Sequence, residues 1–236
     1  MDEIKKLRKH IDKIDLKVLT LLNERSNIAA RIGIEKKSNN LFRPERQAHI
    51  LKQLLNNKQN TIKPEFILAF WRTIFLSQID IQGGIKVIIP KNIGNIDREI
   101  IFDYFSHDIK IIETDSIKKA LEKTNKEKNI LLVLPYPRKN NNLKWWIKKG
   151  VENLYIVSAL PFFLKKSKHP SLVLISRYEP VIEKDFYALY ISKIAIKDKN
   201  LTLVDRASKF YLYKSNRIVK NKNLKLFGIL PKHYEF

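Results

Sequence analysis

The sequence has no cysteine among its 236 residues, which excludes disulfides, thiolate nucleophiles and metal sites built on thiolates. Glycine is scarce, with six residues, and neither a phosphate-binding glycine loop nor a paired-histidine metal motif is present. No apolar run approaches the roughly 20 residues of a membrane-spanning helix, and the N-terminus lacks the apolar stretch of a signal peptide. We therefore expect a cytoplasmic protein without a metal, a cofactor or a membrane partner.

Acidic residues are also few, with 24 Asp and Glu against 46 Lys and Arg, so the formal net charge is +22. A large positive charge is typical of proteins that bind nucleic acids or acidic small molecules. Here the cations are spread along the whole chain, which favours a general compositional bias over a binding patch. We expect no nucleic-acid partner, and a basic dimeric nucleic-acid-binding regulator stays as the alternative from another functional class.

What the sequence does contain is one very long helical pattern at its start. No Pro or Gly occurs before Gly33, and Asp2 favours the first helical turn. Continued to Lys37, the helix would be about 50 Å long. Apolar residues recur along it every three or four positions, at Ile4, Leu7, Ile11, Ile14, Val18, Leu21, Ile28 and Ile32. A small domain cannot bury a seam of this length, so we expect a second copy of the chain to pack against it.

Two cations, Arg25 and Lys36, interrupt this seam at positions where the pattern places a packed residue. One interpretation is that both side chains extend from the seam into solvent. The other is that they bind an anion. The sequence of the next two helices, which should begin at Pro44 and Pro64, favours the anion. The apolar line of the third helix includes Gln78, with Gln82 one turn further on, so both amides should face the same interior as the two cations.

After Gly83 and Gly84 the period changes, and compact apolar runs alternate with helical patterns. We expect strands at 85–89, 109–112, 130–134 and 154–157, separated by helices at 98–105, 117–123 and 143–149. This order predicts a small parallel α/β unit over residues 85–165. A linker at 161–170 should then lead to an α+β module over residues 166–236. Its expected elements are strands at 172–175, 201–204, 209–213 and 224–229, with a helix near 184–192 on one face of an antiparallel sheet.

The helical section holds the residues best suited to chemistry, namely Arg8, Arg25, Lys36, Arg46, Gln78 and Gln82. This set offers several cations and neutral amide donors but no obvious general base or nucleophile. It suits the binding of a multiply charged carboxylate and the stabilisation of a transition state by fixed electrostatics.

The spacing of several short motifs resembles that of the all-helical class of chorismate mutase. The resemblance covers residues 1–84 and rests on Leu7-Arg8, Ile11-Asp12, Asp15, Leu21-Leu22, Glu24-Arg25, Lys36, Arg43-Pro44-Glu45-Arg46 and Gln82. In that family two intertwined all-α subunits enclose the substrate chorismate among their helices. The resemblance implies an isomerase that forms prephenate in the biosynthesis of phenylalanine and tyrosine, acting as a homodimer.

The same resemblance implies a role for each matching position. Arg25 would bind one substrate carboxylate, and Arg8 of the partner subunit would bind the other. Lys36 would contact the ether oxygen and a carboxylate, and Gln82 would donate to the same ether oxygen, with Arg46 supporting the site. The chain departs from the pattern at three further substrate-binding positions. Gln47 stands where many members have an acid that accepts from the substrate hydroxyl, Arg43 where some have an acid, and Gln78 where a serine is common.

The remainder, from residue 85, resembles a shortened prephenate dehydratase domain followed by an ACT-like module. The catalytic Thr-Arg-Phe triplet of the dehydratases is absent from the sequence. The Glu-Ser-Arg-Pro segment associated with phenylalanine binding is also missing, and residues 176–180 resemble it only loosely. We therefore expect no dehydratase activity, and a bifunctional chorismate mutase/prephenate dehydratase stays as the alternative.

Overall fold

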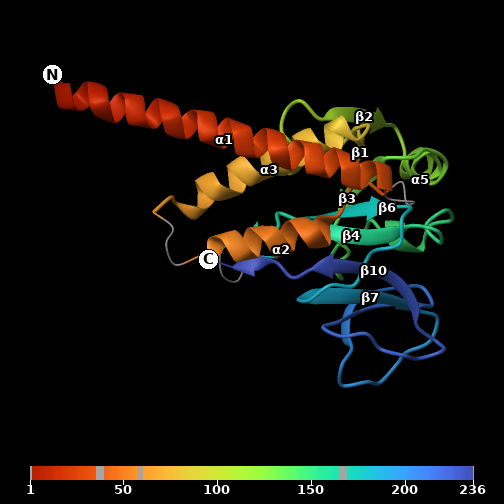
Figure 1. The fold of residues 1–236 in the computed structure, drawn as a ribbon. Helices are drawn as coiled ribbons and strands as arrows, with labels where there is room; N and C mark the ends of the chain where they lie inside the picture. Colours follow the sequence, from red (N-terminus) through yellow and green to blue (C-terminus); the bar gives the residue numbers. More distant parts are fainter. Residues whose placement is uncertain (1, 36–39, 58–60, 165–168, 236) are drawn as a thin grey trace.

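The computed structural model describes residues 2–35, 40–57, 61–164 and 169–235. It begins with three helices, α1 (Asp2–Glu35), α2 (Pro44–Leu55) and α3 (Pro64–Ile81), which confirms the helical start and its very long first helix (Figure 1). Each of the two shorter helices has its proline in the first turn, where the missing N–H would have no helical partner. The predicted end of the first helix at Lys37 lies outside the described residues.

The rest of the chain is organised around a nine-stranded sheet with the order β2-β1-β3-β6-β4-β10-β7-β9-β8, and β11 pairs separately with β5. Two further helices and a 3-10 turn connect its strands. The elements are β1 (Lys86–Pro90), α4 (Asn95–Phe105), β2 (Lys110–Thr114), α5 (Ile117–Lys126), β3 (Ile130–Pro135), η1 (Trp145–Ile147), β4 (Tyr155–Leu160), β5 (Phe163–Leu164), β6 (Leu172–Ser176), β7 (Phe186–Ser192), β8 (Thr202–Ala207), β9 (Phe210–Ser215), β10 (Lys225–Pro231) and β11 (Tyr234–Glu235).

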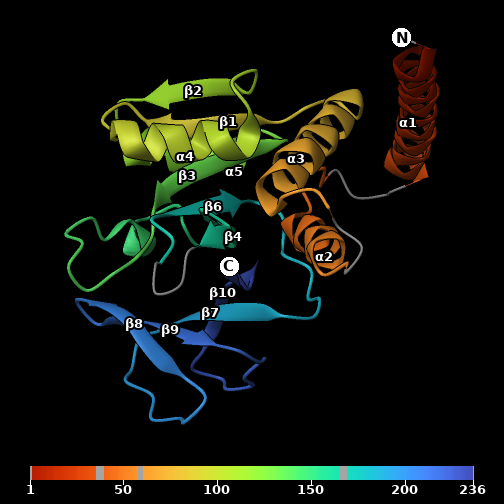
Figure 2. The same ribbon diagram turned by 90° about the vertical axis from the view of Figure 1, so that its left-hand side faces the viewer.

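Both faces of the sheet are covered at its centre. In β3, Ile130 and Leu132 pack with α5 and the two tryptophans of η1, whereas Leu131 and Val133 pack with α4 on the opposite face. The second of these clusters also contains Phe42 and Ile79, so the helical segment shares a core with the sheet. Figure 2 shows α2 and α3 lying between α1 and the sheet.

The order of the central strands differs from the sequence-based expectation. β1 pairs in parallel with β2 and β3, as predicted, but β4 does not lie beside β3. Instead β6, a fully buried apolar run, is inserted between them and is antiparallel to both. One sheet therefore spans the predicted boundary at residue 165. In a strand buried on both faces, polar and apolar residues do not alternate. Its sequence therefore does not indicate which strands it pairs with or in which direction it runs.

Two predicted helices are wrong. Residues 186–192 form β7, because Tyr187, Leu189 and Ile191 pack on one face of the sheet and Ala188 and Tyr190 on the other. This is the period of a strand, and the described residues from 169 onward contain no helix.

The helix predicted at 143–149 is reduced to the turn η1 (Trp145–Ile147). The indole of Trp145 donates to the Pro135 carbonyl (2.8 Å), and that of Trp146 donates to the buried carboxylate of Asp205 (2.9 Å). These contacts with two separate strands fix each ring in the core, and we take them as the reason why the segment does not continue as a helix.

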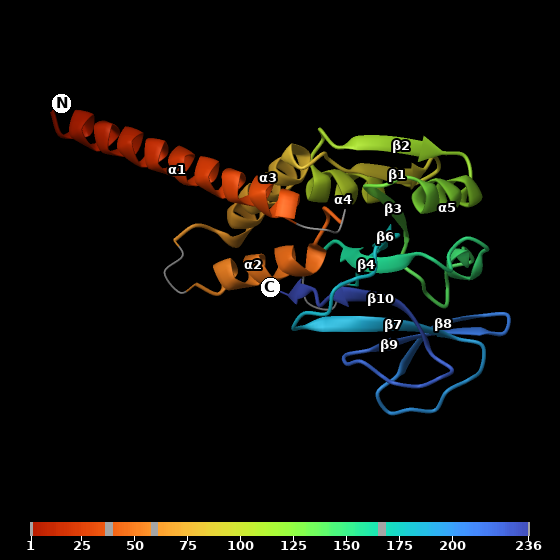
Figure 3. The ribbon, with the colours of Figure 1, turned by 45° about the vertical axis from the view of Figure 1, so that its right-hand side comes forward.

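Helix α1 projects from the rest of the molecule toward its N-terminal end (Figure 3). It contacts α3, yet none of its residues is buried, and its apolar side chains are exposed, for example Leu7 at 58% and Ile11 at 56%. Within the described part of the chain, no helix has the length and apolar character needed to cross a membrane.

The stability of this fold should fall in mild acid because of His233. Burial, and then nearby cations such as Lys214, lower the pKa of His233 from 6.5 to about 4. The native state keeps this ring neutral while the unfolded chain takes up a proton, so stability is lost as the pH falls from 6.5 toward 4. We expect a loss of about 2 kcal/mol, allowing for partial solvent screening. Urea unfolding across this pH range should show a smaller loss for His233→Gln, and equal losses would contradict the assignment.

Candidate active site

A cavity of about 310 Å³ lies where the C-terminal half of α1 meets α2 and α3. Its polar lining consists of Arg25, Arg43, Arg46, Gln47, Gln78 and Gln82. The apolar part of the wall includes Ile28 and Ile32 from α1 and Phe75 from α3. The structure thus brings together six of the eight predicted site residues.

Arg25 is half-buried and is held from two sides. Its guanidinium donates to Oε1 of Gln78, and its guanidinium carbon lies 5.5 Å from the centroid of the Phe75 ring. Burial, and then repulsion from Arg46, lowers the pKa of Arg25 below its ordinary value. The side chain keeps its charge at neutral pH, since arginine stays protonated in proteins. Two neighbouring cations in one cavity suit an anion with more than one charge.

Gln78 carries a buried amide whose nitrogen is unused. The residue is 6% exposed, its Oε1 is occupied by Arg25, and its Nε2 has no hydrogen-bond partner among the residues that the structure describes. An unpaired buried donor costs about 1–3 kcal/mol. A ligand oxygen that reached this nitrogen would remove the cost.

Gln82 closes the cavity at the end of α3. Its Nε2 donates to the Gln78 carbonyl (3.0 Å), which leaves the second N–H of the amide for a ligand. A Cβ atom at Gly33 would lie 2.9 Å from Cγ of Gln82. Glycine at this position therefore allows α1 to approach the Gln82 side chain closely.

The side chains at the start of α2 differ in how far other residues of the chain already engage them. Arg43 forms an ion pair with Glu45, which offsets its charge, whereas Arg46 is exposed at the cavity. Gln47 accepts a hydrogen bond at Oε1 from the hydroxyl of Tyr104 on α4 (3.2 Å). Arg46 is thus the cation of this group that is most available to a ligand.

Two predicted site residues are not among the described lining residues of this cavity. Arg8 is exposed on the projecting half of α1 and does not line it. Lys36 lies outside the described residues. The described residues of one chain therefore supply only part of the predicted cation set to this cavity.

The lining of this cavity limits its chemistry. None of its described lining residues is an aspartate, a glutamate or a histidine, so those residues supply neither a general base nor a general acid that titrates near neutral pH. Fixed guanidinium and amide donors can bind carboxylates and stabilise negative charge that develops on an oxygen atom. The arrangement suits a reaction that needs orientation and electrostatics without proton transfer.

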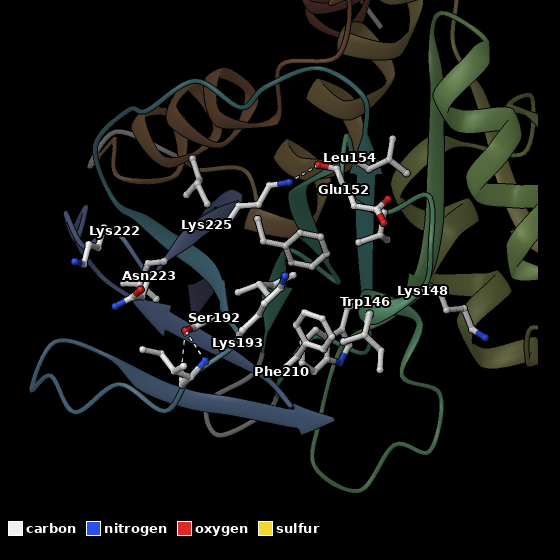
Figure 4. Close-up of a pocket in the computed structure, with 17 residues that line it drawn as sticks. Trp146, Lys148, Glu152, Leu154, Ser192, Lys193, Phe210, Lys222, Asn223 and Lys225 are labelled. Atoms are coloured by element: carbon white, nitrogen blue, oxygen red, sulfur yellow. Dashed lines mark hydrogen bonds between the residues drawn. The ribbon is translucent and has the colours of Figure 1, made fainter. Parts of the chain in front are cut away.

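A larger cavity, of about 580 Å³, lies between η1 and the C-terminal strands (Figure 4). Apolar residues such as Phe210 and Phe227 form much of its wall, and its rim carries Lys148, Lys193, Lys222 and Lys225. Lys225 donates to the Glu152 carbonyl (2.7 Å). This cavity contains none of the predicted site residues, so we assign the candidate active site to the smaller, arginine-lined cavity.

Sequence reasoning missed two residues of the site. Phe75, which supports Arg25, is one helical turn before Gln78 and Ile79, so its place on the inner face of α3 could have been inferred from that spacing. Tyr104, which binds Gln47, belongs to α4 of the following segment. No local pattern connects a residue there to a position 57 residues earlier.

Residues 7–83 match the family model described as chorismate mutase type II. Three similar proteins share the description bifunctional chorismate mutase/prephenate dehydratase. The Aquifex aeolicus protein is 39% identical over 93 residues, which cover 37% of this chain and 26% of the relative. The Pseudomonas aeruginosa protein is 31% identical over 93 residues, covering 36% and 26%. The Neisseria gonorrhoeae protein is 23% identical over 128 residues, covering 54% and 35%. The matched part is thus about a quarter to a third of each relative's length.

Proposed function

We propose that this chain, whose residues 7–83 form a chorismate mutase type II domain, isomerises chorismate to prephenate in aromatic amino acid biosynthesis. The observation that carries the proposal is the pairing of Arg25 with Gln78 in a cavity whose described lining has no acid or base. The amide nitrogen of Gln78 is buried and unpaired among the described residues, and a substrate oxygen that reached it would supply the missing partner. The cytoplasmic location stays a prediction from the sequence.

The reaction requires few groups beyond the cations and amide donors that line this cavity. In the rearrangement a C–O bond of the substrate breaks while a C–C bond forms, so no proton is transferred. Arg25 would bind one carboxylate and hold the compact conformer, and Gln82 would donate to the ether oxygen on which negative charge develops. Gln78 would contact the carboxylate at Arg25. The roles of Lys36, at the ether oxygen, and of Arg46, as a supporting cation, stay predictions.

A homodimer would complete the site. The apolar seam of α1 is exposed in one chain, and covering such a surface is favourable by about 25 cal/mol for each Å² removed from water. A partner helix packed along this seam would cover it. It would also carry its own Arg8 to the cavity, where Arg8 would bind the second carboxylate in trans. Sedimentation of the purified chain should give the mass of a dimer, and a monomer at micromolar concentration would contradict this part of the proposal.

Turnover should be nearly independent of pH between about 6 and 9. The described lining offers only arginine and glutamine as polar groups, and Arg25 stays protonated over this range although its pKa is lowered. Initial rates of chorismate loss in a constant-ionic-strength buffer series would measure the profile. A tenfold change with a single midpoint in this range would show that a titrating group takes part in the reaction.

The product identifies the function and separates it from the bifunctional alternative. Incubation with chorismate should accumulate prephenate, seen by chromatography, with no phenylpyruvate. The relatives' descriptions include a dehydratase, but the Thr-Arg-Phe triplet is absent from this sequence. Phenylpyruvate formed in proportion to the protein concentration would establish the second activity, and no loss of chorismate would refute the first.

A further inference from the structure

Tyr104 connects the segment after residue 85 to the arginine-lined cavity. It lies on α4, and its hydroxyl donates to Oε1 of Gln47, a lining residue of the cavity on α2 (3.2 Å). Burial raises the pKa of the Tyr104 hydroxyl well above its ordinary value, so the group stays protonated and able to donate at any physiological pH. The contact joins two helices that belong to different predicted segments of the chain.

The ring of Tyr104 is fixed by its surroundings. The Phe42 ring meets it edge-on at 6.4 Å between centroids, and the Phe105 ring does so at 4.8 Å. The Arg72 guanidinium lies 5.5 Å from its centroid and is itself held by the Asp103 carbonyl (3.1 Å). A ring packed in this way has little freedom to rotate, so its hydroxyl is held at one point above Gln47.

The contact occupies the oxygen end of the Gln47 amide. Because Oε1 accepts from Tyr104, the two N–H groups of Nε2 are the groups that this lining residue has left to offer to a ligand. Without Tyr104 the amide could rotate and present either end. Fixing an amide before a ligand arrives removes the cost of ordering it on binding.

We propose that Tyr104 is a positioning residue for the mutase reaction, which sets Gln47 as a hydrogen-bond donor to the substrate hydroxyl. The inference rests on the proposed function. It makes the segment from residue 85 onward part of the mutase site through α4.

A double-mutant cycle tests the coupling. Tyr104→Phe removes only the hydroxyl, and we expect it to lower kcat/KM for chorismate about three- to tenfold, the effect of one hydrogen bond. In a Gln47→Ala background the same change should have no further effect, because the group that Tyr104 positions is gone. Equal losses in both backgrounds would show that Tyr104 acts through general stability. No loss in either would overturn the proposal.

Tyr155→Phe is the matched control. Tyr155 packs against the same buried cluster as Tyr104 but does not line the cavity. We expect removal of the Tyr155 hydroxyl to leave kcat/KM unchanged, both in the wild-type chain and in the Gln47→Ala background. Thermal unfolding of all variants would show whether a change in activity follows a change in stability.

A second readout does not depend on turnover. The side-chain amide resonances of Gln47, assigned in ¹⁵N-labelled protein by comparison with Gln47→Ala, should shift in Tyr104→Phe and not in Tyr155→Phe. A shift without chorismate turnover in the wild-type chain would leave the positioning contact standing and refute the proposed function. Turnover without a shift would refute the role of Tyr104 alone.

Discussion

Replacing Arg25 by alanine should lower kcat/KM for chorismate about 10²- to 10³-fold. The guanidinium is held by Gln78 and the Phe75 ring before any ligand arrives, so its contribution needs no reorganisation during the reaction. Its removal also leaves the Oε1 of Gln78 without its donor, which loosens an amide that lines the cavity. Initial rates at several chorismate concentrations would measure the loss.

The loss must be separated from an effect on folding. Arg31 lies on the same helix, is exposed, and does not line the cavity, so Arg31→Ala removes the same charge outside the site. We expect Arg31→Ala to retain activity and both variants to retain the far-ultraviolet circular dichroism of the wild type. Full activity in Arg25→Ala, or equal losses in the two variants, would refute the assigned role of Arg25.

Mixed dimers of two inactive variants should recover about half of the wild-type activity, because one of their two sites is intact. Arg8→Ala and Arg25→Ala should each be nearly inactive as homodimers. If Arg8 acts in trans, a dimer of one subunit of each kind has one site with both arginines and one with neither. Co-expression with two different affinity tags and tandem purification would isolate these dimers for assay.

The control for this experiment pairs Arg25→Ala with the double variant Arg8→Ala/Arg25→Ala. No site in that dimer contains Arg25, so activity should stay as low as in the parents. Recovery in the control would indicate contamination by wild-type protein. Mixed dimers as inactive as both parents, or an Arg8→Ala homodimer with full activity, would contradict a site shared between subunits.

The helical part of the fold could be predicted from the sequence because its signals are local. Apolar spacing defines α1, and prolines in the first turns mark the starts of α2 and α3. Gln78 and Gln82 were placed with Arg25 because residues three or four positions apart share a helix face. The cavity brings these three side chains together. Their roles in catalysis stay predictions until they are tested.

The sheet shows where local signals fail. Most strand positions were predicted, yet a run such as β6 is apolar on both faces, and nothing in it indicates that it enters between β3 and β4. β7 was mistaken for a helix because its polar and apolar residues do not alternate when both faces are buried. Tyr104 was missed for a related reason, since its contact with Gln47 depends on how α4 packs against α2.

The most direct test of the proposed function is the rate at which the purified full chain consumes chorismate, followed by the fall in chorismate absorbance. We predict a rate that is proportional to protein concentration, well above the uncatalysed reaction, and lost in Arg25→Ala measured beside it. A rate equal to the uncatalysed one at every protein concentration would contradict the assignment of the arginine-lined cavity as a chorismate mutase site.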